Sequence, residues 1–461
     1  MSARARNSAA ATKSPRRAEE AVVVGGGLAG ITAALRLADA GRSVTLLEGR
    51  PRLGGAAFSF KRGDLSIDNG QHVFLRCCDS YQWLIKRLDA EADIVLQPRL
   101  DIPVLRADGR SAHLSRLPGV PAPAHLTGAL VRYGLLRPAD RLRAVRGALA
   151  LRRLDPSDAS LDARTLGAFL REHGQNDATI DALWGIVAVA TLNLAPDEAS
   201  LALAAKVFRT GLLDHAAAAD VGYAGVPLGE VHSTKAQRAL DKAGVEVLLS
   251  HRVESVEAGT VRARGRDGTR EWTPDAVVLA VPHDEVLTAV PALRSTPVAR
   301  AEGLGAAPIV NVHVVYDRRV TDLAFAAAVN SPVQWFFDRT DTSGLERGQY
   351  LAVTVSAADA IIDEPSKSIQ ARYIDELARL LPAAARATVV DAFVTRERRA
   401  TFRQAAGTAA LRPGPRSGLD GVWLAGAWTA TGWPDTMESA VRSGIAAADD
   451  VLQVPVLEVA A

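Results

Sequence analysis

The stretch AVVVGGGLAGITAALRLADAGRSVTLLEGR, residues 21–50, decides the fold. Its apolar pattern predicts a buried strand over 21–24, a helix over about 28–40 and a second strand over 44–47. A strand, a glycine-rich turn, a helix and a further strand in this order are the start of a doubly wound parallel sheet. We therefore predict an α/β protein with a Rossmann-type domain.

The glycines of this stretch indicate a dinucleotide site. Gly25 allows a tight turn, Gly27 lets backbone amides approach a pyrophosphate, and Gly30 lets helix and strand pack closely. The phosphates are expected at the helix N-terminus, where unpaired N–H groups favour negative charge. Glu48 ends the second strand, where it can accept hydrogen bonds from a ribose diol and disfavours a 2′-phosphate. The first cofactor residues are therefore Gly25, Gly27, Leu28, Ala29, Gly30 and Glu48.

The next residues favour FAD over NAD. In EGRPRLGG (48–55), Arg52 precedes the pair Gly54-Gly55, so the segment offers a cation and a second close-approach loop. A cofactor longer than NAD needs such a second loop. We add Gly49, Arg50, Arg52, Gly54 and Gly55 to the predicted FAD site.

Two later segments are expected to return to the same domain. In 421–452 an apolar strand over 422–425 leads into a Gly/Trp/Thr loop and a helix of small residues from about Thr436, whose N-terminal amides can face the flavin pyrimidine oxygens. The stretches 245–259 and 276–282 are predicted as strands of the same sheet. From these segments we assign Val253, Gly426, Trp433, Thr436 and Met437 to the cofactor, with Val253 reaching the adenine edge through its backbone.

The predicted organisation is therefore a discontinuous FAD-binding domain carrying an inserted α+β substrate domain. Strands are predicted within the second insertion at 308–317 and 333–339. The proposed boundaries are 20–78, 226–290 and 416–452 for the FAD domain, 79–225 and 291–415 for the substrate domain, a disordered basic tail over 1–19 and a tail over 453–461.

Composition excludes several classes of protein. A chain of 461 residues with 48% hydrophobic and 23% charged residues is typical of a globular protein with more than one core. A net charge of +2 gives no case for a nucleic-acid partner. The two cysteines, Cys77 and Cys78, are adjacent and cannot build a disulfide framework, which favours the cytoplasm. The first 18 residues lack the apolar core of a secretory signal.

The segments above resemble the flavin-dependent amine oxidase and carotenoid desaturase superfamily over residues 20–452. DNGQHVFLRCCDSYQWL (68–84) and LWGIVAVATLNLAPDEASLALAAKVFRTGLL (183–213) are similar to its squalene-associated branch, the hydroxysqualene dehydroxylases of hopanoid biosynthesis, and 348–359 and 432–444 agree. The resemblance implies that reduced FAD converts hydroxysqualene, a C30 isoprenoid alcohol, to squalene.

Two positions depart from the superfamily pattern. Ala56 stands where an arginine commonly follows the double glycine, and Ala427 stands where an aspartate often follows the glycine of the C-terminal turn. Both departures remove cofactor contacts, while Arg52 and the backbone donors remain. The C-terminal region contains no cysteine for covalent attachment, so FAD is expected to be bound noncovalently.

The resemblance also implies that the polar residues 68–72 pass beside the flavin ring. Asp68, Gln71 and His72 are then polar groups near a reacting centre. Loss of an allylic hydroxyl needs an acid, and we predict His72 in that role, held charged by Asp68. Asp435 and Glu438 are the alternative acids, whereas His232 and His283 are expected at the surface or in loops.

The stretch 117–155 suggests how a water-insoluble substrate is reached. Leucine and alanine alternate with arginines, which predicts a basic amphipathic helical surface for an anionic membrane; the alternative is a solvated arginine face over a core helix. Moving a CH₂ group out of water is favourable by roughly 0.8 kcal/mol, so a chain of about 30 carbons hardly dissolves in water. An enzyme that acts on it must take it from a bilayer or from a partner enzyme. We expect a peripheral protein at the inner face of the cell membrane. The expected partners are upstream squalene-pathway synthases and an electron donor such as NADPH or a reductase.

Three alternatives remain open. A carotenoid or phytoene-type desaturase would run the opposite redox direction on a similar polyene. An amine oxidase would use an aromatic cage, which Trp428 and Trp433 can imitate. A flavoprotein without catalytic activity would account for Ala56 and Ala427.

Overall fold

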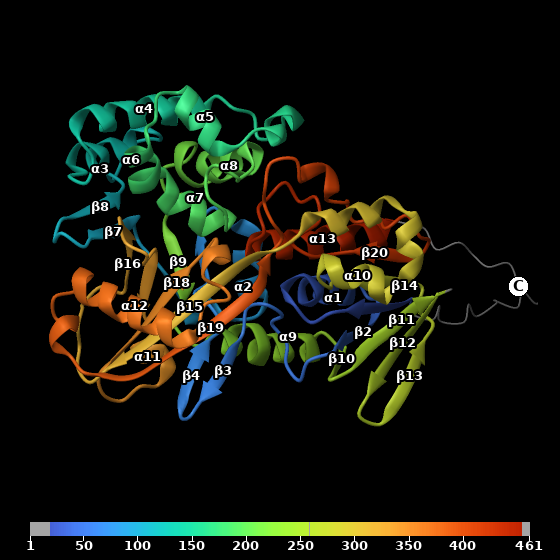
Figure 1. The fold of residues 1–461 in the computed structure, drawn as a ribbon. Coiled ribbons are helices and arrows are strands. Elements are labelled where there is room, and N and C mark those ends of the chain that lie inside the picture. The colour runs from blue at the N-terminus through green and yellow to red at the C-terminus, as the bar shows by residue number, and fades with distance from the viewer. Residues whose placement is uncertain (1–18, 258, 454–461) are drawn as a thin grey trace, which may run out of the picture.

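The computed structural model describes residues 19–257 and 259–453. The expectations for the two chain ends, at residues 1–18 and 454–461, lie outside the described residues. Figure 1 shows the described chain as a parallel-sheet layer at one end, a mixed sheet beside it and a cap of helices over the mixed sheet.

The predicted Rossmann-type sheet is present, and it is built from three separate parts of the chain. Five parallel strands lie in the order β10–β2–β1–β14–β20, so β1 and β2 are paired with each other and strands from later in the chain flank them on both sides. Helices α1 (Leu28–Asp39) and α13 (Met437–Gln453) pack against each other so closely that a Cβ on Gly444 would lie 2.3 Å from the Ala29 oxygen. The strands are β1 (Glu20–Val24), β2 (Ser43–Glu48), β10 (Glu246–Leu249), β14 (Ala276–Leu279) and β20 (Val422–Leu424).

One predicted strand does not join this sheet. Only β10 of the 245–259 segment pairs with β2, while residues 252–257 form an antiparallel sheet of their own with the two strands that follow. Ser250, at φ 57°, turns the chain out of the parallel sheet, and its N–H then donates to the Arg50 oxygen beyond the end of β2. The three strands of the separate sheet are β11 (Arg252–Glu257), β12 (Thr260–Gly265) and β13 (Gly268–Trp272).

The second layer is a seven-stranded mixed sheet in the order β19–β15–β18–β17–β16–β7–β8. Both strands predicted here are present, as β15 and β17. Apolar side chains on one face pack against helix α12 (Ser366–Leu380). The strands are β7 (Asp101–Arg106), β8 (Ser111–Ser115), β15 (Ala307–Tyr316), β16 (Phe325–Val329), β17 (Trp335–Asp338), β18 (Gln349–Val355) and β19 (Val389–Thr401).

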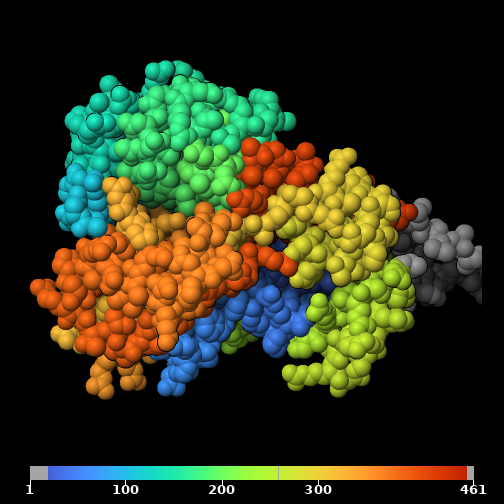
Figure 2. Space-filling model, in the orientation of Figure 1, coloured from blue at the N-terminus to red at the C-terminus, as the bar shows by residue number. Residues whose placement is uncertain are grey.

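The third layer is helical and covers the end of the mixed sheet (Figures 1 and 2). The stretch 117–155, predicted to be helical, forms two helices that residues 133–137 separate. The long alternation of apolar and basic residues reflects two short helices, each with its own buried side. The helices are α3 (Thr127–Arg132), α4 (Pro138–Arg152), α5 (Leu166–Glu172), α6 (Asp177–Thr179), α7 (Gly185–Leu192) and α8 (Leu201–Phe208).

Two small sheets connect these layers and position the polar stretch 68–72. Strand β4 ends at Asp68 and β5 begins at Val73, so the intervening residues pass from one small sheet to the other. The remaining elements are β3 (Ser59–Arg62), β4 (Leu65–Asp68), β5 (Val73–Leu75), β6 (Ile94–Leu96), β9 (Val221–Ala224), α2 (Asp79–Arg87), α9 (Ala236–Lys242), α10 (His283–Ala289) and α11 (Thr340–Ser343).

Candidate functional site

The N-terminus of α1 has the properties of an anion site. Gly27 caps the helix without any side-chain hydrogen bond, and the first turn holds no acidic residue. The first N–H groups of the helix therefore remain available to phosphate oxygens. A Cβ on Gly30 would lie only 1.8 Å from the Gly25 oxygen, which explains the glycine at the third position of the motif.

The double glycine brings a second loop directly onto this turn. Gly54 N–H donates to the Gly26 oxygen at 2.9 Å, and a Cβ on Gly55 would lie 2.8 Å from the Gly27 Cα. Gly55 also has φ +58°, a conformation that side chains disfavour. The two loops form a backbone cradle that fits a pyrophosphate, and any side chain at Gly55 would close it.

Glu48 lies at the end of β2, as the sequence predicts, and it already binds backbone. Its Oε2 accepts from Gly26 N–H at 2.6 Å and its Oε1 accepts from Arg50 N–H at 2.7 Å. A carboxylate has about four lone-pair positions, so acceptor capacity remains for a ribose diol. His251 N–H donates to the Glu48 backbone oxygen. This hydrogen bond holds the chain just before Val253 at the end of β2, beside Glu48.

Two arginines converge where the superfamily pattern has one at position 56. The Nη1 atoms of Arg50 and Arg52 lie 3.3 and 3.2 Å from the Gly55 oxygen, to which both donate. The Arg52 guanidinium also lies 3.5 Å from the centre of the Phe58 ring. Burial, and then the neighbouring charge of Arg50, lowers the pKa of Arg52. The cations that Ala56 cannot supply are thus present on the preceding residues.

The C-terminal loop is held by Arg412. This buried side chain donates to the backbone oxygens of Ala427, Trp428, Thr429 and Trp433, and burial lowers its pKa to about 10. Gly426 opens the loop at φ +141°. Thr436 ends it, where its Oγ1 accepts from Ser439 N–H at 3.3 Å and caps α13. The N-terminal amides of α13 therefore start at Met437, one residue after the predicted position.

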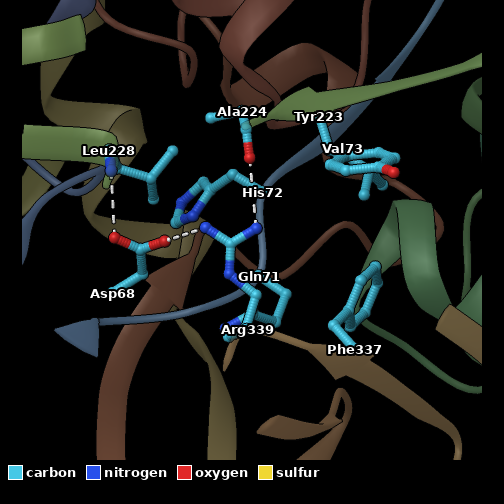
Figure 3. A pocket seen from close by; sticks show the side chains of 9 residues that line it. All are labelled: Asp68, Gln71, His72, Val73, Tyr223, Ala224, Leu228, Phe337 and Arg339. Carbon is cyan, nitrogen blue, oxygen red and sulfur yellow. Dashed lines mark hydrogen bonds and ion pairs between the residues drawn. The ribbon is translucent and has the colours of Figure 1, made fainter. Parts of the chain in front are cut away.

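Asp68 and Arg339 form the centre of a small pocket (Figure 3). Asp68 Oδ2 lies 2.7 Å from Arg339 Nη2, and both side chains are almost completely buried. Asp68 Oδ1 accepts from Ser59 Oγ and from Leu228 N–H. Arg339 Nη1 donates to the Ala224 oxygen. Strand ends from three sheets thus meet at one ion pair.

His72 lies beside this pair in the same pocket. Its Nδ1 is 3.1 Å from the Gly70 oxygen, so Nδ1–H is the donor and Nε2 is the ring nitrogen left for another partner. Burial of the ring lowers the pKa of His72. That Asp68 keeps this imidazole charged stays a prediction; the ion pair of Asp68 with Arg339 and the desolvation of the His72 ring both act against it.

Apolar side chains enclose the other sides of the pocket. Val73, Leu228 and Phe337 line it, and the Tyr223 ring lies near Val73, on the side of the pocket away from Asp68 (Figure 3). Burial raises the pKa of Tyr223. Gln71 also lines the pocket, and its Nε2 is buried without a hydrogen-bond partner among the described residues. The polar centre is thus bordered by the buried side chains of Leu228 and Phe337, while Val73, 41% exposed, lies on the solvent side.

Asn69 connects this pocket to the cofactor cradle. Its Oδ1 accepts from Phe58 N–H, its Nδ2 donates to the Ala56 oxygen at 2.8 Å, and its backbone oxygen accepts from Asn311 Nδ2. Glu397 on β19 lies 3.3 Å from the same Nδ2. The loop after the double glycine is therefore fixed against the mixed sheet, at the position where the polar stretch passes.

These features together match a known family. The family model described as "Flavin containing amine oxidoreductase" matches residues 28–452, nearly the whole described chain. The chain belongs to this family. It is therefore a flavin-dependent oxidoreductase, and the cradle formed by the two glycine loops fits the phosphates of such a cofactor.

Several relatives of this flavin oxidoreductase carry the names of enzymes that act on isoprenoids. Hydroxysqualene dehydroxylase from Rhodopseudomonas palustris is 30% identical over 93% of this chain and 97% of its own, and the enzyme of that name from Sinorhizobium fredii is 29% identical over the same shares. A 15-cis-phytoene desaturase from Narcissus pseudonarcissus is 27% identical over 95% of this chain and 80% of its own.

Solved structures agree on the fold. Putrescine oxidase has a TM-score of 0.70 at 18% identity, over 95% of this chain and 100% of that one. An oxidoreductase from Methanosarcina mazei has a TM-score of 0.71 at 14% identity, over 94% and 100% of the two chains. At these identities the likeness shows the shared fold alone.

The alternative acids of this flavin oxidoreductase lie elsewhere. Asp435 does not line the His72 pocket; its Oδ2 accepts from Phe402 N–H at 2.8 Å, and burial raises its pKa to about 6. Glu438 is buried and caps α2 by accepting from Ser80 and Tyr81 N–H, and it also pairs with Arg442. Both carboxylates are thus engaged in holding the C-terminal segment.

His232 does not lie where the sequence predicts it. Predicted at the surface, it is completely buried, with Nε2 2.9 Å from Tyr81 Oη, and burial lowers its pKa to about 3. It lies on a π-helical turn over Glu230–Lys235 and packs against Gly54, so it supports the double-glycine loop. Nothing in the local sequence VHSTK distinguishes an inward histidine from a surface one.

Several residues that build the site carry little or no signal in the sequence. Arg339 directly follows the apolar strand β17, and a charged residue at the end of a buried strand was the available signal. Tyr223 and Glu397 carry no such local signal. Arg412 is one of many arginines in the chain, and only its five contacts to the C-terminal loop distinguish it.

Proposed function

We propose that this protein reduces hydroxysqualene to squalene in squalene and hopanoid biosynthesis, with noncovalently bound FAD as its cofactor. The named relatives support this reaction, since two hydroxysqualene dehydroxylases are 30% and 29% identical over 93% of the chain. The observation that carries the proposal is the free Nε2 of His72 beside the internally paired Asp68 and Arg339 in one pocket.

The proposed reaction balances as follows. His72 Nε2–H gives its proton to the allylic hydroxyl, the C–O bond breaks, and water leaves with the bonding electron pair. A reduced flavin held by the two glycine loops would supply the hydride that completes the reduction at the allylic carbon. The net change is reduction of the alcohol by two electrons, with one proton and one hydride consumed for each water released.

The pocket residues support this chemistry in distinct ways. Because burial lowers the pKa of His72, its imidazolium is a stronger acid than free histidine, at the cost of a smaller protonated population near neutral pH. The Asp68–Arg339 pair is internally neutralised, so Asp68 is not a free anion that would capture the carbocation. The buried side chains of Phe337 and Leu228 exclude water on their side of the pocket, where water would return the cation to an alcohol.

The cofactor assignment keeps the residues predicted from the sequence. Backbone amides at Gly27–Gly30 and Gly55 would hold the pyrophosphate, Glu48 the ribose, Arg50 and Arg52 the negative charge, and Met437 the flavin ring. No cysteine occurs among the residues of the C-terminal loop, which supports noncovalent binding. We further propose Val253 at the adenine edge and NADPH or a reductase as the electron donor.

A phytoene-type desaturase is the second candidate, because a relative of that name is 27% identical over 95% of the chain.

An amine oxidase is less well supported. Trp428 donates its Nε1–H to the Val281 oxygen within a core, and the centre of the Trp433 ring lies 4.8 Å from Lys206 Nζ and 4.9 Å from Arg442 Cζ. Neither tryptophan is left free to form one wall of an aromatic cage.

An anaerobic single turnover tests the proposal. The yellow protein is reduced with dithionite, mixed with hydroxysqualene in detergent, and followed by the flavin absorbance while lipids are extracted. The proposal expects the oxidised flavin band to return with one squalene formed per flavin. A flavin that stays reduced with intact substrate would refute it, and oxidation of phytoene by the oxidised protein would then establish the desaturase reading.

A further inference from the structure

The outer helices of the cap carry an apolar surface that the proposed chemistry does not use. Seven large apolar side chains are exposed among the described residues, and four of them lie on α3 and α4. Leu142 and Val131 are the most exposed, at 73% and 69%, followed by Leu149 at 43% and Val145 at 38%. Clustering of this kind marks an interaction site more often than scattered exposure does.

Helical geometry places three of these residues on one side of α4. Leu142, Val145 and Leu149 are spaced by three and four positions, so they form a stripe along one face. The opposite face is buried, through Asp140, Ala144, Gly147, Ala150 and Leu151. The stripe therefore points away from the core over the whole length of the helix.

Contacts on the buried face prevent α4 from rotating the stripe inward. Asp140, 1% exposed, binds Arg137, Arg143 and Asn176. A Cβ on Gly147 would lie 3.0 Å from Trp184 and from Gln175, so the helix is already in close contact with its neighbours. The exposed stripe is a fixed feature of the folded chain.

Arginines flank the stripe on both sides. At 100° per residue, Arg146 and Arg153 lie along one edge, and Arg141 and Arg152 lie along the other. Arg132, Arg146, Arg152 and Arg153 are exposed, and none has a carboxylate partner in the part of the chain that the structure describes. Arg141 donates to the Val131 and Leu136 oxygens, which brings the end of α3 and its exposed valine beside the stripe.

We propose that this surface docks onto an anionic lipid bilayer. We call it the α4 ridge and define it by Val131, Leu142, Val145, Leu149 and the four unpaired arginines. An exposed apolar line flanked by arginines that lack carboxylate partners complements a layer of negative headgroups over hydrocarbon. Figure 1 places α4 along the outer rim of the helical layer, where a flat surface can reach it.

Docking at the α4 ridge would give the protein access to a substrate that dissolves in the bilayer, and this use of the surface rests on the proposed function. The binding to lipid does not rest on it, because it depends only on the residues of the ridge. No helix among residues 19–257 and 259–453 is long and apolar enough to cross a membrane. The ridge would therefore bind at the membrane surface.

The test measures binding of the full-length, flavin-loaded protein to sedimented vesicles of phosphatidylcholine with or without 30 mol% phosphatidylglycerol. One variant removes the stripe (Leu142→Ser, Val145→Ser, Leu149→Ser), and another removes charge (Arg146→Gln, Arg152→Gln, Arg153→Gln). Val390→Ser, on β19, controls for loss of an exposed apolar residue. Arg266→Gln with Arg300→Gln and Arg347→Gln controls for the same loss of charge at other exposed arginines.

The expected result is binding to the anionic vesicles alone, weakened by salt, and a partition coefficient at least tenfold lower for both ridge variants. The two controls should bind like the wild type, and flavin content should show that every variant folds. Absence of binding by the wild type, unchanged binding by the ridge variants, or an equal loss in the charge control would overturn the proposal. So would a wild-type dimer that the stripe variant abolishes, because the ridge would then be an interface between copies.

Failure of the docking proposal is distinguishable from failure of the proposed function. With hydroxysqualene supplied in detergent, the ridge variants should turn over like the wild type, because none of their substituted residues lines the His72 pocket. Vesicle binding without squalene formation would refute the reaction and leave the docking surface intact.

Discussion

Asp68 and Arg339 lie 271 positions apart in the chain and form one buried ion pair, with 2.7 Å between Oδ2 and Nη2. Their side chains are 5% and 8% exposed. The pair joins the end of β4 to the residue that follows β17, and through Leu228 and Ala224 it also holds the segment after β9. One interaction thus closes the pocket in which His72 lies.

Removing one member of this pair should be costly. Arg339→Met leaves the Asp68 carboxylate buried without its cation, and we expect a loss of about 3–5 kcal/mol of folding free energy. Urea denaturation followed by circular dichroism measures it. Arg318→Met, which breaks the exposed pair with Asp317, is the matched control and should cost less than about 1 kcal/mol. Equal effects of the two substitutions would contradict the structural role of the buried pair.

The pH dependence of turnover tests His72. Burial lowers its pKa below the usual value of 6.5, and the reaction needs the protonated ring, so kcat/KM should rise as pH falls toward that lowered pKa. His72→Gln should lower turnover by about 100-fold or more and abolish this pH dependence, while flavin content stays unchanged. His113→Gln, at an exposed histidine paired with Asp101, is the control. A wild-type pH profile in His72→Gln would remove His72 from the role.

The cofactor cradle is tested by two glycines of equal conformation. Gly55 and Gly63 both have φ +58°, but a Cβ on Gly55 meets Gly27 at 2.8 Å, whereas nothing lies within 4 Å of a Cβ on Gly63. Alanine at either position therefore meets the same unfavourable φ, and only alanine at position 55 also clashes with a neighbouring backbone. We expect Gly55→Ala to be purified with little flavin and Gly63→Ala with a full complement, as measured by the flavin-to-protein absorbance ratio. Full flavin content in both would show that the cradle lies elsewhere.

Asp435 should make stability depend on pH. Burial raises its folded-state pKa from 3.8 to about 6, so the folded protein binds the proton more tightly than the unfolded chain. This contribution is fully present below pH 3.8 and is lost as pH rises through 6, and it amounts to at most ~3 kcal/mol. Asp435→Asn should therefore flatten the stability profile between pH 4 and 7, measured by urea denaturation at each pH. A profile as steep as that of the wild type would assign the dependence to other groups.

Much of the fold could be predicted because its signals are local. The strand, glycine turn, helix and acidic strand end of residues 21–50 are adjacent in sequence, and their backbone requirements are met by residue types at fixed spacing. Similar short-range patterns predicted the two glycine loops, the strands at 308–317 and 333–339 and the start of α13. The strand at 252–257 was assigned to the wrong sheet, because strand patterns do not specify which edge a strand joins.

The sequence by itself determined the strand, glycine turn and helix of residues 21–50 and the double-glycine loop, since tight turns and helix termini depend on residues within a few positions of one another. Only the tertiary structure decided that Asp68 pairs with Arg339, that His232 is buried against Gly54 and that Leu142 faces outward. These outcomes depend on which distant segments become neighbours. A carboxylate takes whichever cation the fold brings to it, and a histidine or leucine is buried or exposed according to what packs over it.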